Sequence, residues 1–164
     1  MAAFNATPRL TLAAMAALCL AAVGAALVSQ HVFDMRPCPW CILQRVIFVV
    51  IALLCLVGAL VPPAAARKPA TIAAIVLAFL GGAAALYQHF VAAKSSSCNL
   101  TLADKIITAL NLESLAPPLF QVTGTCADAA VDLLGVPYEF WALALFVVLA
   151  IVAATVVRTP RPRG

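Results

Sequence analysis

The sequence predicts an all-α membrane protein, a bundle of four transmembrane helices. Of its 164 residues, 65% are hydrophobic and 10% are charged, which is too apolar for a water-soluble domain. Crossing a hydrocarbon core of roughly 30 Å takes about 20 consecutive apolar residues, and the chain contains four charge-free windows of that size. None alternates apolar and polar residues as a membrane β-strand does, so helices must satisfy the backbone in lipid.

The four windows place the helices at about 10–31, 42–61, 70–91 and 139–157, within a single integral membrane domain, 1–164. The first window has two interpretations, a retained helix or a cleaved signal peptide. Its apolar stretch exceeds the roughly 7 to 15 residues of a signal-peptide core, which favours a retained helix. Both interpretations leave the loop that follows on the same side of the membrane.

The charges predict the orientation of the bundle. The N-terminus, the middle loop and the tail fall on one side; they carry basic residues and no acid, namely Arg9, Arg67, Lys68, Arg158, Arg161 and Arg163. The opposite side, with loops at about 32–41 and 92–138, carries both signs. By the positive-inside rule the basic side and both termini are cytoplasmic. The net charge of +4 is thus explained by topology and calls for no nucleic-acid partner.

The outward loops collect four of the six cysteines in two pairs, Cys38 with Cys41 and Cys98 with Cys126. Cys19 and Cys55 fall near the middle of predicted helices, where a cysteine behaves as a small, unreactive hydrophobe. Thiols outside the cytoplasm tend toward disulfides, so both pairs have a structural interpretation as well as a redox one.

The stretch "RPCPWCILQR", residues 36–45, favours redox chemistry for the first pair. A disulfide that closes so short a loop removes little chain entropy and stabilises little. A Cys-X-X-Cys arrangement instead lowers the pKa of one thiol, and the thiolate attacks disulfides. Attachment of a c-type haem would need His in place of Ile42. A four-cysteine zinc site fits poorly because the second pair lacks short spacing, so we predict no metal.

Two polar residues near the outer helix ends are candidate ligand-binding residues. Arg45 lies four residues after Cys41, on the same helix face and one turn deeper. Its guanidinium either reaches the headgroups or faces inward and stabilises negative charge on the Cys41 sulfur and on a bound molecule. At about 4 Å and a dielectric near 20, such a pair is worth up to ~4 kcal/mol before desolvation. His89 is either a hydrogen-bonded interfacial anchor or a ligand-facing residue.

The segment 99–120, "NLTLADKIITALNLESLAPPLF", is too polar to span a membrane. Its apolar residues follow helical spacing, which predicts a short helix in the membrane interface that ends at Pro117 and Pro118. It either tethers a moving loop or is a plain amphipathic connector.

With four spans, "CPWCILQR" before the second span, outward Cys98 and Cys126, and "CADAAVDLLGVPYEFW" leading into the last span, the chain resembles the DsbB, or disulfide bond formation protein B, family. The resemblance covers essentially the whole membrane core. The placement of two cysteine pairs, with an arginine four residues after the second cysteine, is its specific part.

The resemblance implies an enzyme of the bacterial inner membrane with its active cysteines on the periplasmic side. The enzyme would take electrons from a DsbA-like thioredoxin-fold thiol oxidase and deliver them to a quinone, ubiquinone or menaquinone. The catalytic residues would be Cys38, Cys41, Cys98 and Cys126. The partner's thiolate would attack Cys98, and Cys126 would attack Cys38 and so release Cys41, while Arg45 and His89 would lie near the quinone.

Two positions depart from the family pattern. Gln44 stands where some members carry an acid, and the spacer Pro39-Trp40 replaces aliphatic spacers. Two rival functions also remain open. A vitamin K epoxide reductase-like enzyme would place its Cys-X-X-Cys near the end of a later span. A non-enzymatic membrane protein with structural disulfides would tolerate loss of Arg45.

Overall fold

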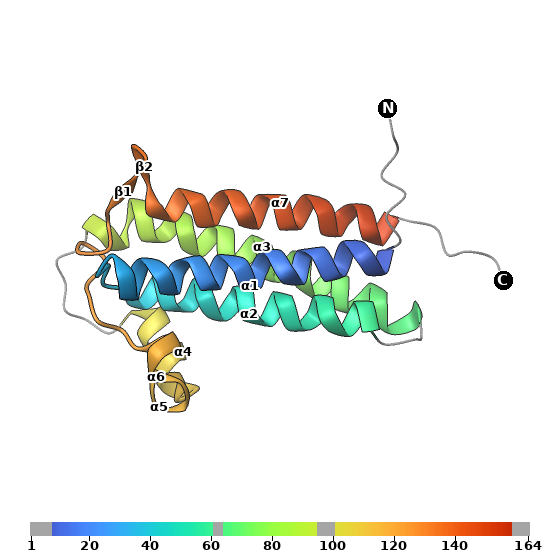
Figure 1. Cartoon of the computed structure of the whole chain (residues 1–164), viewed down its shortest axis with the longest axis horizontal. Coiled ribbons are helices and arrows are strands. Elements are labelled where there is room, and N and C mark those ends of the chain that lie inside the picture. The colour runs from blue at the N-terminus through green and yellow to red at the C-terminus, as the bar shows by residue number, and fades with distance from the viewer. Residues whose placement is uncertain (1–7, 61–63, 95–100, 159–164) are drawn as a thin grey trace.

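Four long helices form a bundle and carry almost all of the apolar sequence (Figure 1). The computed structural model describes residues 8–60, 64–94 and 101–158. The helices are α1 (Pro8–Val32), α2 (Pro39–Leu60), α3 (Ala64–Phe90) and α7 (Tyr138–Arg158). Each is long and apolar enough to cross a membrane. The predicted all-α fold with four spanning helices is therefore confirmed.

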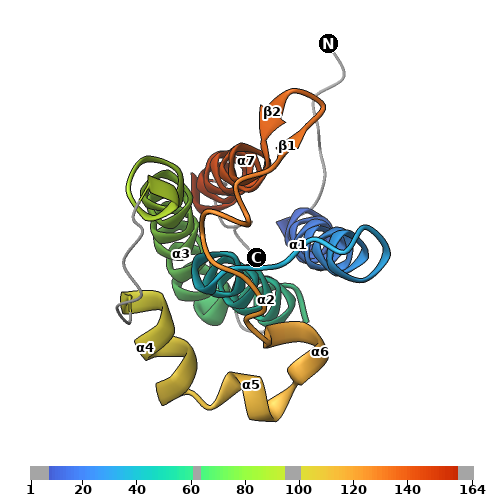
Figure 2. The same ribbon diagram turned by 90° about the vertical axis from the view of Figure 1, so that its left-hand side faces the viewer.

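The bundle core forms where α2 packs between α1 and α3, and where α3 packs on α7 (Figure 2). One cluster fills its middle, with Leu12, Cys19, Ile51, Cys55, Phe146 and Leu149 each at most 1% exposed. Two rings stack at its centre, because Phe48 of α2 lies parallel to Phe146 of α7 at 4.1 Å between centroids. Cys19 and Cys55 belong to this apolar cluster.

Gly81 of α3 makes the close approach of α3 and α7 possible. A Cβ atom at this position would lie 2.4 Å from the ring of Phe146, well inside van der Waals contact. At the next residue, Gly82, the nearest atom to a Cβ would be Leu143 Cδ1, at 3.4 Å. Small residues at such crossings let membrane helices pack through their backbones.

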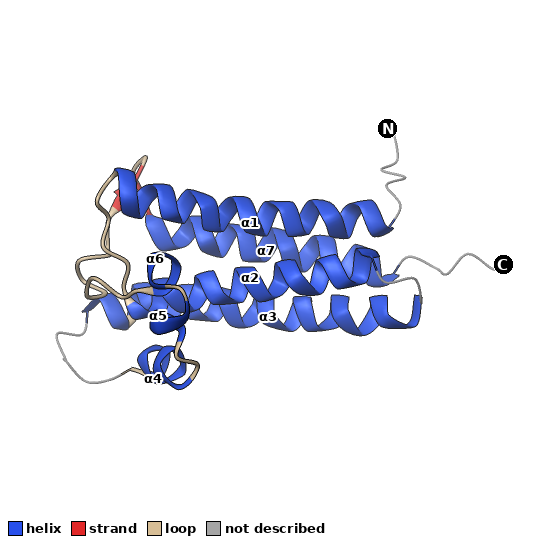
Figure 3. Cartoon of the chain, turned by 60° about the horizontal axis from the view of Figure 1, so that its bottom comes forward, coloured by secondary structure: helices blue, strands red, loops and turns tan. Residues whose placement is uncertain are grey.

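Three short helices occupy the second long connection: α4 (Leu102–Ala109), α5 (Leu112–Leu115) and α6 (Pro117–Phe120). They lie beside the bundle at one end and curve past α2 toward α1 (Figures 2 and 3). Ile107 of α4 and Phe120 of α6 pack on Ile42 of α2 and anchor this segment. A single turn of 3₁₀-helix, η1 (Ala92–Lys94), follows α3.

The predicted single helix that ends at Pro117 and Pro118 is wrong. α4 starts at a capping box, in which Thr101 and Asp104 bond each other's backbone N–H groups, and the helix stops because Asn111 adopts a left-handed conformation, φ 50°. Pro117 instead begins α6. Proline fits this position because the first N–H groups of a helix have no partner within the helix, so the N–H group that proline lacks is not needed.

A two-stranded hairpin, β1 (Asp132–Leu133) and β2 (Val136–Pro137), leads directly into α7, and the sequence reasoning missed it. Its turn contains Leu134 and Gly135, both with positive φ. The hairpin, the short helices and the start of α2 gather at one end of the bundle (Figure 1). Arg9, Arg67 and Arg158 lie in the terminal turns of helices at the opposite end.

Candidate functional site

Cys38 and Cys41 lie together at the start of α2. Cys38 immediately precedes the helix and is fully buried, whereas Cys41 occupies the first turn and is partly exposed. Their sulfur atoms are 2.9 Å apart, and the backbone N–H of Cys41 donates to Cys38 Sγ at 3.3 Å. Because helical geometry holds the two side chains together, only a small movement separates the two thiols from a disulfide.

Cys126 comes from the distant loop before the hairpin, and its sulfur accepts a hydrogen bond from the Cys38 thiol. The Trp40 backbone N–H also donates to Cys126. Two backbone bonds hold the two loops against each other, since the N–H groups of Thr123 and Gly124 both donate to the Pro37 carbonyl, at 3.1 and 3.2 Å. The fold therefore places Cys126, from the second cysteine pair, next to Cys38, from the first pair.

Removing the Cys38 thiol should slow the alkylation of Cys126 in the reduced protein. The hydrogen bond from Cys38 holds the pKa of Cys126 below its ordinary value, against the opposing effect of burial. At neutral pH a lowered pKa leaves a larger thiolate fraction, and the thiolate is the reactive form. In Cys38→Ala the pKa rises toward its ordinary value, so iodoacetamide should react several-fold more slowly near neutral pH.

Mass spectrometry of the peptide that contains Cys126 would measure this rate. At a pH well above the ordinary thiol pKa both proteins should react alike, which controls for a change in access. Cys41→Ala is the matched control, because it keeps the Cys38 donor. Equal rates for Cys38→Ala and wild type near neutral pH would contradict the assigned hydrogen bond.

Two glutamines form a buried hydrogen-bond chain that ends at Cys41. Gln44 Nε2 donates to Gln88 Oε1 at 2.7 Å, and Gln88 Nε2 donates to Cys41 Sγ at 3.3 Å. The side chains are 5% and 2% exposed, so neither donor is available to bulk water. A donor aimed at the sulfur favours its thiolate form. Gln88 therefore connects Gln44 to Cys41.

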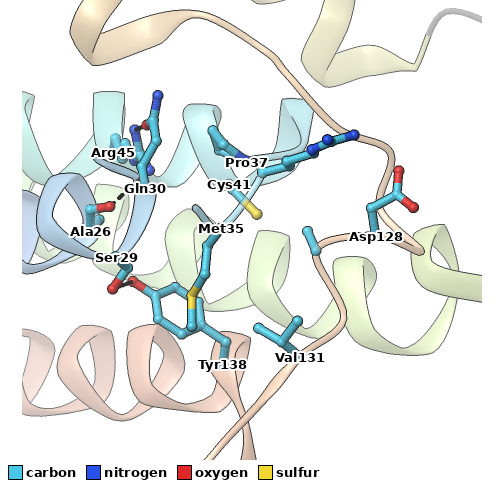
Figure 4. Close-up of a pocket in the computed structure, with 12 residues that line it drawn as sticks. Ala26, Ser29, Gln30, Met35, Pro37, Cys41, Arg45, Asp128, Val131 and Tyr138 are labelled. Carbon is cyan, nitrogen blue, oxygen red and sulfur yellow. Dashed lines mark hydrogen bonds between the residues drawn. The ribbon is translucent and has the colours of Figure 1, made fainter. Parts of the chain in front are cut away.

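Arg45 faces the interior of the bundle, with 7% of the residue exposed. Its guanidinium donates to Gln30 Oε1 at 2.6 Å and to the carbonyl oxygens of Ala26 and Leu119, at 3.2 and 3.1 Å. These acceptors belong to α1 and α6, so the side chain does not reach toward the headgroups. Three of its five N–H donors are used in this way, and the positive charge remains beside Cys41 (Figure 4).

A cavity of about 260 Å³ begins at Cys41 and continues between α1, α2 and α7. Its polar wall lies around Cys41 and its remaining wall is apolar; the polar lining residues are Ser29, Gln44, Arg45, Gln88, Tyr138 and Glu139. A smaller pocket of about 30 Å³ shares Cys41, Arg45 and Tyr138 with it and reaches the outer loops (Figure 4). Mostly apolar cavities with a few convergent polar groups are typical of small-molecule sites.

His89 lies beside this cavity and contacts it through Glu139. Its Nδ1 is 2.6 Å from Glu139 Oε1, and its ring packs against the ring of Phe140 at 4.7 Å. His89 is outside the wall that the described residues form, while the Glu139 side chain, 2% exposed, is part of it. The structure therefore pairs His89 with a residue that the sequence indicated only as the start of the last span.

The structure brings together four of the six candidate residues, Cys38, Cys41, Cys126 and Arg45, and places His89 one residue away from their cavity. Cys98 lies outside the described residues. Sequence reasoning missed the roles of Gln30, Gln88 and Glu139. A search for uncharged polar residues within the apolar windows would have found the two glutamines, because buried polar groups in membrane helices need partners.

Comparisons with known proteins identify the family. The family model for "Disulfide bond formation protein DsbB" matches residues 8–156, nearly the whole chain. The chain belongs to the DsbB family. Disulfide bond formation protein B 1 of Pseudomonas syringae pv. syringae (strain B728a) is 38% identical over 149 residues, covering 88% of this chain and 86% of that protein. Disulfide bond formation protein B of Herminiimonas arsenicoxydans is 35% identical over 147 residues, with 90% and 92% covered.

Membership in the DsbB family makes the chain a multi-pass membrane oxidoreductase involved in disulfide bond formation. It confirms the family resemblance seen in the sequence. It also decides against the two rival functions, a vitamin K epoxide reductase-like enzyme and a membrane protein whose disulfides are only structural.

Proposed function

We propose that this protein reoxidises a DsbA-like thiol oxidase of the periplasm by relaying its electrons through two cysteine pairs to a membrane quinone. The observation that carries the proposal is the position of the Cys38–Cys41 pair. Cys38 faces Cys126 on the loop side, and Cys41 lines the larger cavity together with Arg45. One thiol pair therefore connects a loop cysteine with a site that opens among the membrane helices.

The relay starts with the Cys98–Cys126 pair as a disulfide. A thiolate of the partner attacks Cys98 and forms a mixed disulfide, and Cys126 leaves as the thiolate. Cys126 attacks Cys38 in the Cys38–Cys41 disulfide and releases Cys41 as the thiolate. The partner's second thiol then displaces Cys98, which reforms its bond with Cys126 and frees Cys38. Each exchange makes one S–S bond and breaks one.

The geometry supports the order of these steps. Cys126 packs against the cluster that contains Cys38 and accepts a hydrogen bond from the Trp40 backbone N–H, which favours its thiolate. Cys126 is therefore placed as the nucleophile, and Cys38 is the sulfur that it faces. When Cys41 leaves as a thiolate, Gln88 donates to its sulfur, and the Arg45 charge lies next to it. Both groups favour a negative sulfur at the cavity wall.

The cavity fits a quinone ring. A cavity of about 150 Å³ admits benzene, and this one, at about 260 Å³, has room for a substituted ring. Ser29, Gln44, Arg45 and Gln88 would hold the ring oxygens, and Phe48, Trp141 and Leu145 would cover its faces. When bound, a quinone supplies an acceptor for two electrons and two protons. Reoxidation of a strongly oxidising thiol oxidase requires such an acceptor, because ordinary disulfides are too weak as oxidants.

The proposed orientation places the loops and the cysteines in the periplasm and the basic helix ends in the cytoplasm. The described basic residues Arg9, Arg67 and Arg158 lie at the end of the bundle that is opposite the cysteines. This arrangement satisfies the positive-inside rule. A bacterial inner membrane supplies both the quinone and the oxidising compartment that the relay needs.

Quinone reduction by purified protein tests the proposal. Protein in detergent would be mixed with a reduced DsbA-type thiol oxidase and a short-chain ubiquinone, and the loss of quinone absorbance would be followed. We expect steady turnover for wild type. Cys38→Ser, Cys41→Ser, Cys98→Ser and Cys126→Ser should each lose at least a hundredfold in rate, because every cysteine forms an obligatory bond in the relay.

The double variant Cys19→Ala with Cys55→Ala is the matched control, because both cysteines lie in the apolar core. It should retain turnover close to that of wild type. If wild type oxidises the partner without reducing quinone, or if a cysteine variant of the relay turns over normally, the proposed function is wrong. A menaquinone analogue in parallel reactions would identify the preferred quinone.

A further inference from the structure

The Glu139 carboxyl is a buried polar group that the relay of cysteines does not use. Glu139 lies in the first turn of α7, with 2% of its side chain exposed, and lines the cavity. One oxygen, Oε1, is bonded to His89. The other, Oε2, is fully buried and has no hydrogen-bond partner among the described residues. An unpartnered carboxylate oxygen in a membrane bundle is costly, which indicates that it has a partner in the loaded site.

The ionisable groups that line the cavity are Cys41, Arg45, Tyr138 and Glu139. Arg45 uses three N–H donors to bond α1 and α6. Cys41 is the electron-donating sulfur of the proposed relay. The hydroxyl of Tyr138 donates to Ser29 at 3.4 Å. Within this wall, Glu139 is the group that can carry a proton and that also contacts His89, a partly exposed residue.

His89 provides the connection to the exterior. It is the penultimate residue of α3, at the end of the bundle that carries the loops, and 29% of its side chain is exposed. Its Nδ1 contacts Glu139, and its Nε2 has no hydrogen-bond partner among the described residues. An imidazole in this position can take a proton at one nitrogen and release one at the other, as proton shuttles do.

We infer that Glu139 is a catalytic proton carrier, which gives a proton from its carboxyl to an oxygen of the bound quinone ring and is reprotonated from outside through His89. This inference rests on the proposed function and deepens it. Glu139 adds a proton path on the α7 side of the cavity to the electron path that starts at Cys41.

The protons and electrons balance. Oxidation of the partner's two thiols releases two electrons and two protons, and reduction of the ring consumes the same numbers. The electrons arrive through Cys41, which leaves the relay as a thiolate. Glu139 supplies the proton for one ring oxygen, and the second proton is taken up from the water into which the partner's thiols release theirs. His89 returns a proton to Glu139. No further reductant or oxidant is required.

Glu139→Gln tests the inference, because glutamine keeps the size and the hydrogen-bonding capacity of the side chain but cannot donate an acidic proton. General acid catalysis typically contributes about 10²- to 10⁴-fold. We therefore expect kcat for quinone reduction to fall at least 100-fold. Binding of a short-chain ubiquinone to the oxidised protein, measured by quenching of tryptophan fluorescence, should change by less than threefold.

Two further readouts separate proton transfer from folding and from the relay. Without quinone, one equivalent of reduced thiol oxidase should still be oxidised by Glu139→Gln at the wild-type rate. In infrared difference spectra of reduced minus oxidised protein, wild type should show a carboxyl band that shifts in D₂O and is absent from the variant. His89→Gly should also be slow, and added imidazole should restore its rate.

Asp132→Asn is the matched control, because Asp132 is an exposed carboxylate in β1, seven residues before Glu139. It should show wild-type kcat and an unchanged infrared band. Glu139→Asp keeps an acidic proton and should recover part of the rate. If wild type reduces quinone and Glu139→Gln does so within twofold of its rate, the inference is overturned alone. If wild type reduces no quinone, the proposed function fails and the inference fails with it.

Discussion

Replacing Arg45 with glutamine should lower kcat/KM for quinone reduction by about 10- to 150-fold, because a hydrogen bond to a charged group is worth about 1.5–3 kcal/mol. Among the described residues that line the large cavity, Arg45 is the only arginine, and its guanidinium lies beside Cys41. Its loss also removes a donor from the partly buried carbonyl groups of Ala26 and Leu119. Initial rates over a range of quinone concentrations would separate a change in KM from a change in kcat.

Arg45→Lys is the informative companion to this variant. Lysine keeps the charge but not the planar fork that reaches α1 and α6 together, so an intermediate rate is expected. Lys105→Gln removes an exposed charge from α4 and should leave the rate unchanged. Wild-type kinetics in Arg45→Gln, with the protein correctly folded, would show that the guanidinium has no role at the cavity.

Gly81→Ala should destabilise the bundle by about 1–3 kcal/mol, the usual cost of overpacking a well-packed core. The new Cβ atom would lie 2.4 Å from the Phe146 ring, which is fully buried and stacked on Phe48. The gain in helix propensity, about 0.5–1 kcal/mol, is too small to compensate. The midpoint of thermal unfolding in detergent, followed by circular dichroism, should fall by several degrees.

Gly82→Ala is the matched control at the adjacent residue. Its Cβ would meet only Leu143 Cδ1, at 3.4 Å, which is an ordinary contact at the end of a side chain. The midpoint of this variant should equal or exceed that of wild type, because the same gain in helix propensity is not opposed by a clash. A Gly81→Ala protein as stable as wild type would mean that α3 and α7 separate at little cost.

The helical fold could be predicted because the constraint behind it is strong. A run of about 20 apolar residues in lipid has one way to satisfy its backbone, and the charges mark where each run ends. The short elements could not be predicted in this way. The left-handed Asn111 ends α4, and the positive φ of Leu134 and Gly135 turns the hairpin. Such single-residue conformations leave little trace in hydrophobic periodicity.

The candidate site was predictable where chemistry depends on spacing along the chain. Cys41 and Arg45 are one helical turn apart, so their shared location follows from sequence. The contact of Gln88 with Cys41 joins residues 47 positions apart, and that of His89 with Glu139 joins residues 50 apart. These contacts depend on the rotation of α3 and α7 about their own axes. Residue spacing and hydrophobic pattern along the chain do not predict that rotation.

The two hydrogen bonds on the Pro37 carbonyl have a kinetic consequence. They fix the segment before Cys126 to the residue before Cys38, so in the proposed relay the exchange between these sulfurs is a reaction within one molecule. Well-oriented groups held in this way react as if at effective concentrations of about 10⁵–10⁸ M. The abundance of the partner can then limit only the encounter at the outer cysteine pair. Throughput at low partner levels would depend on how often the two proteins meet.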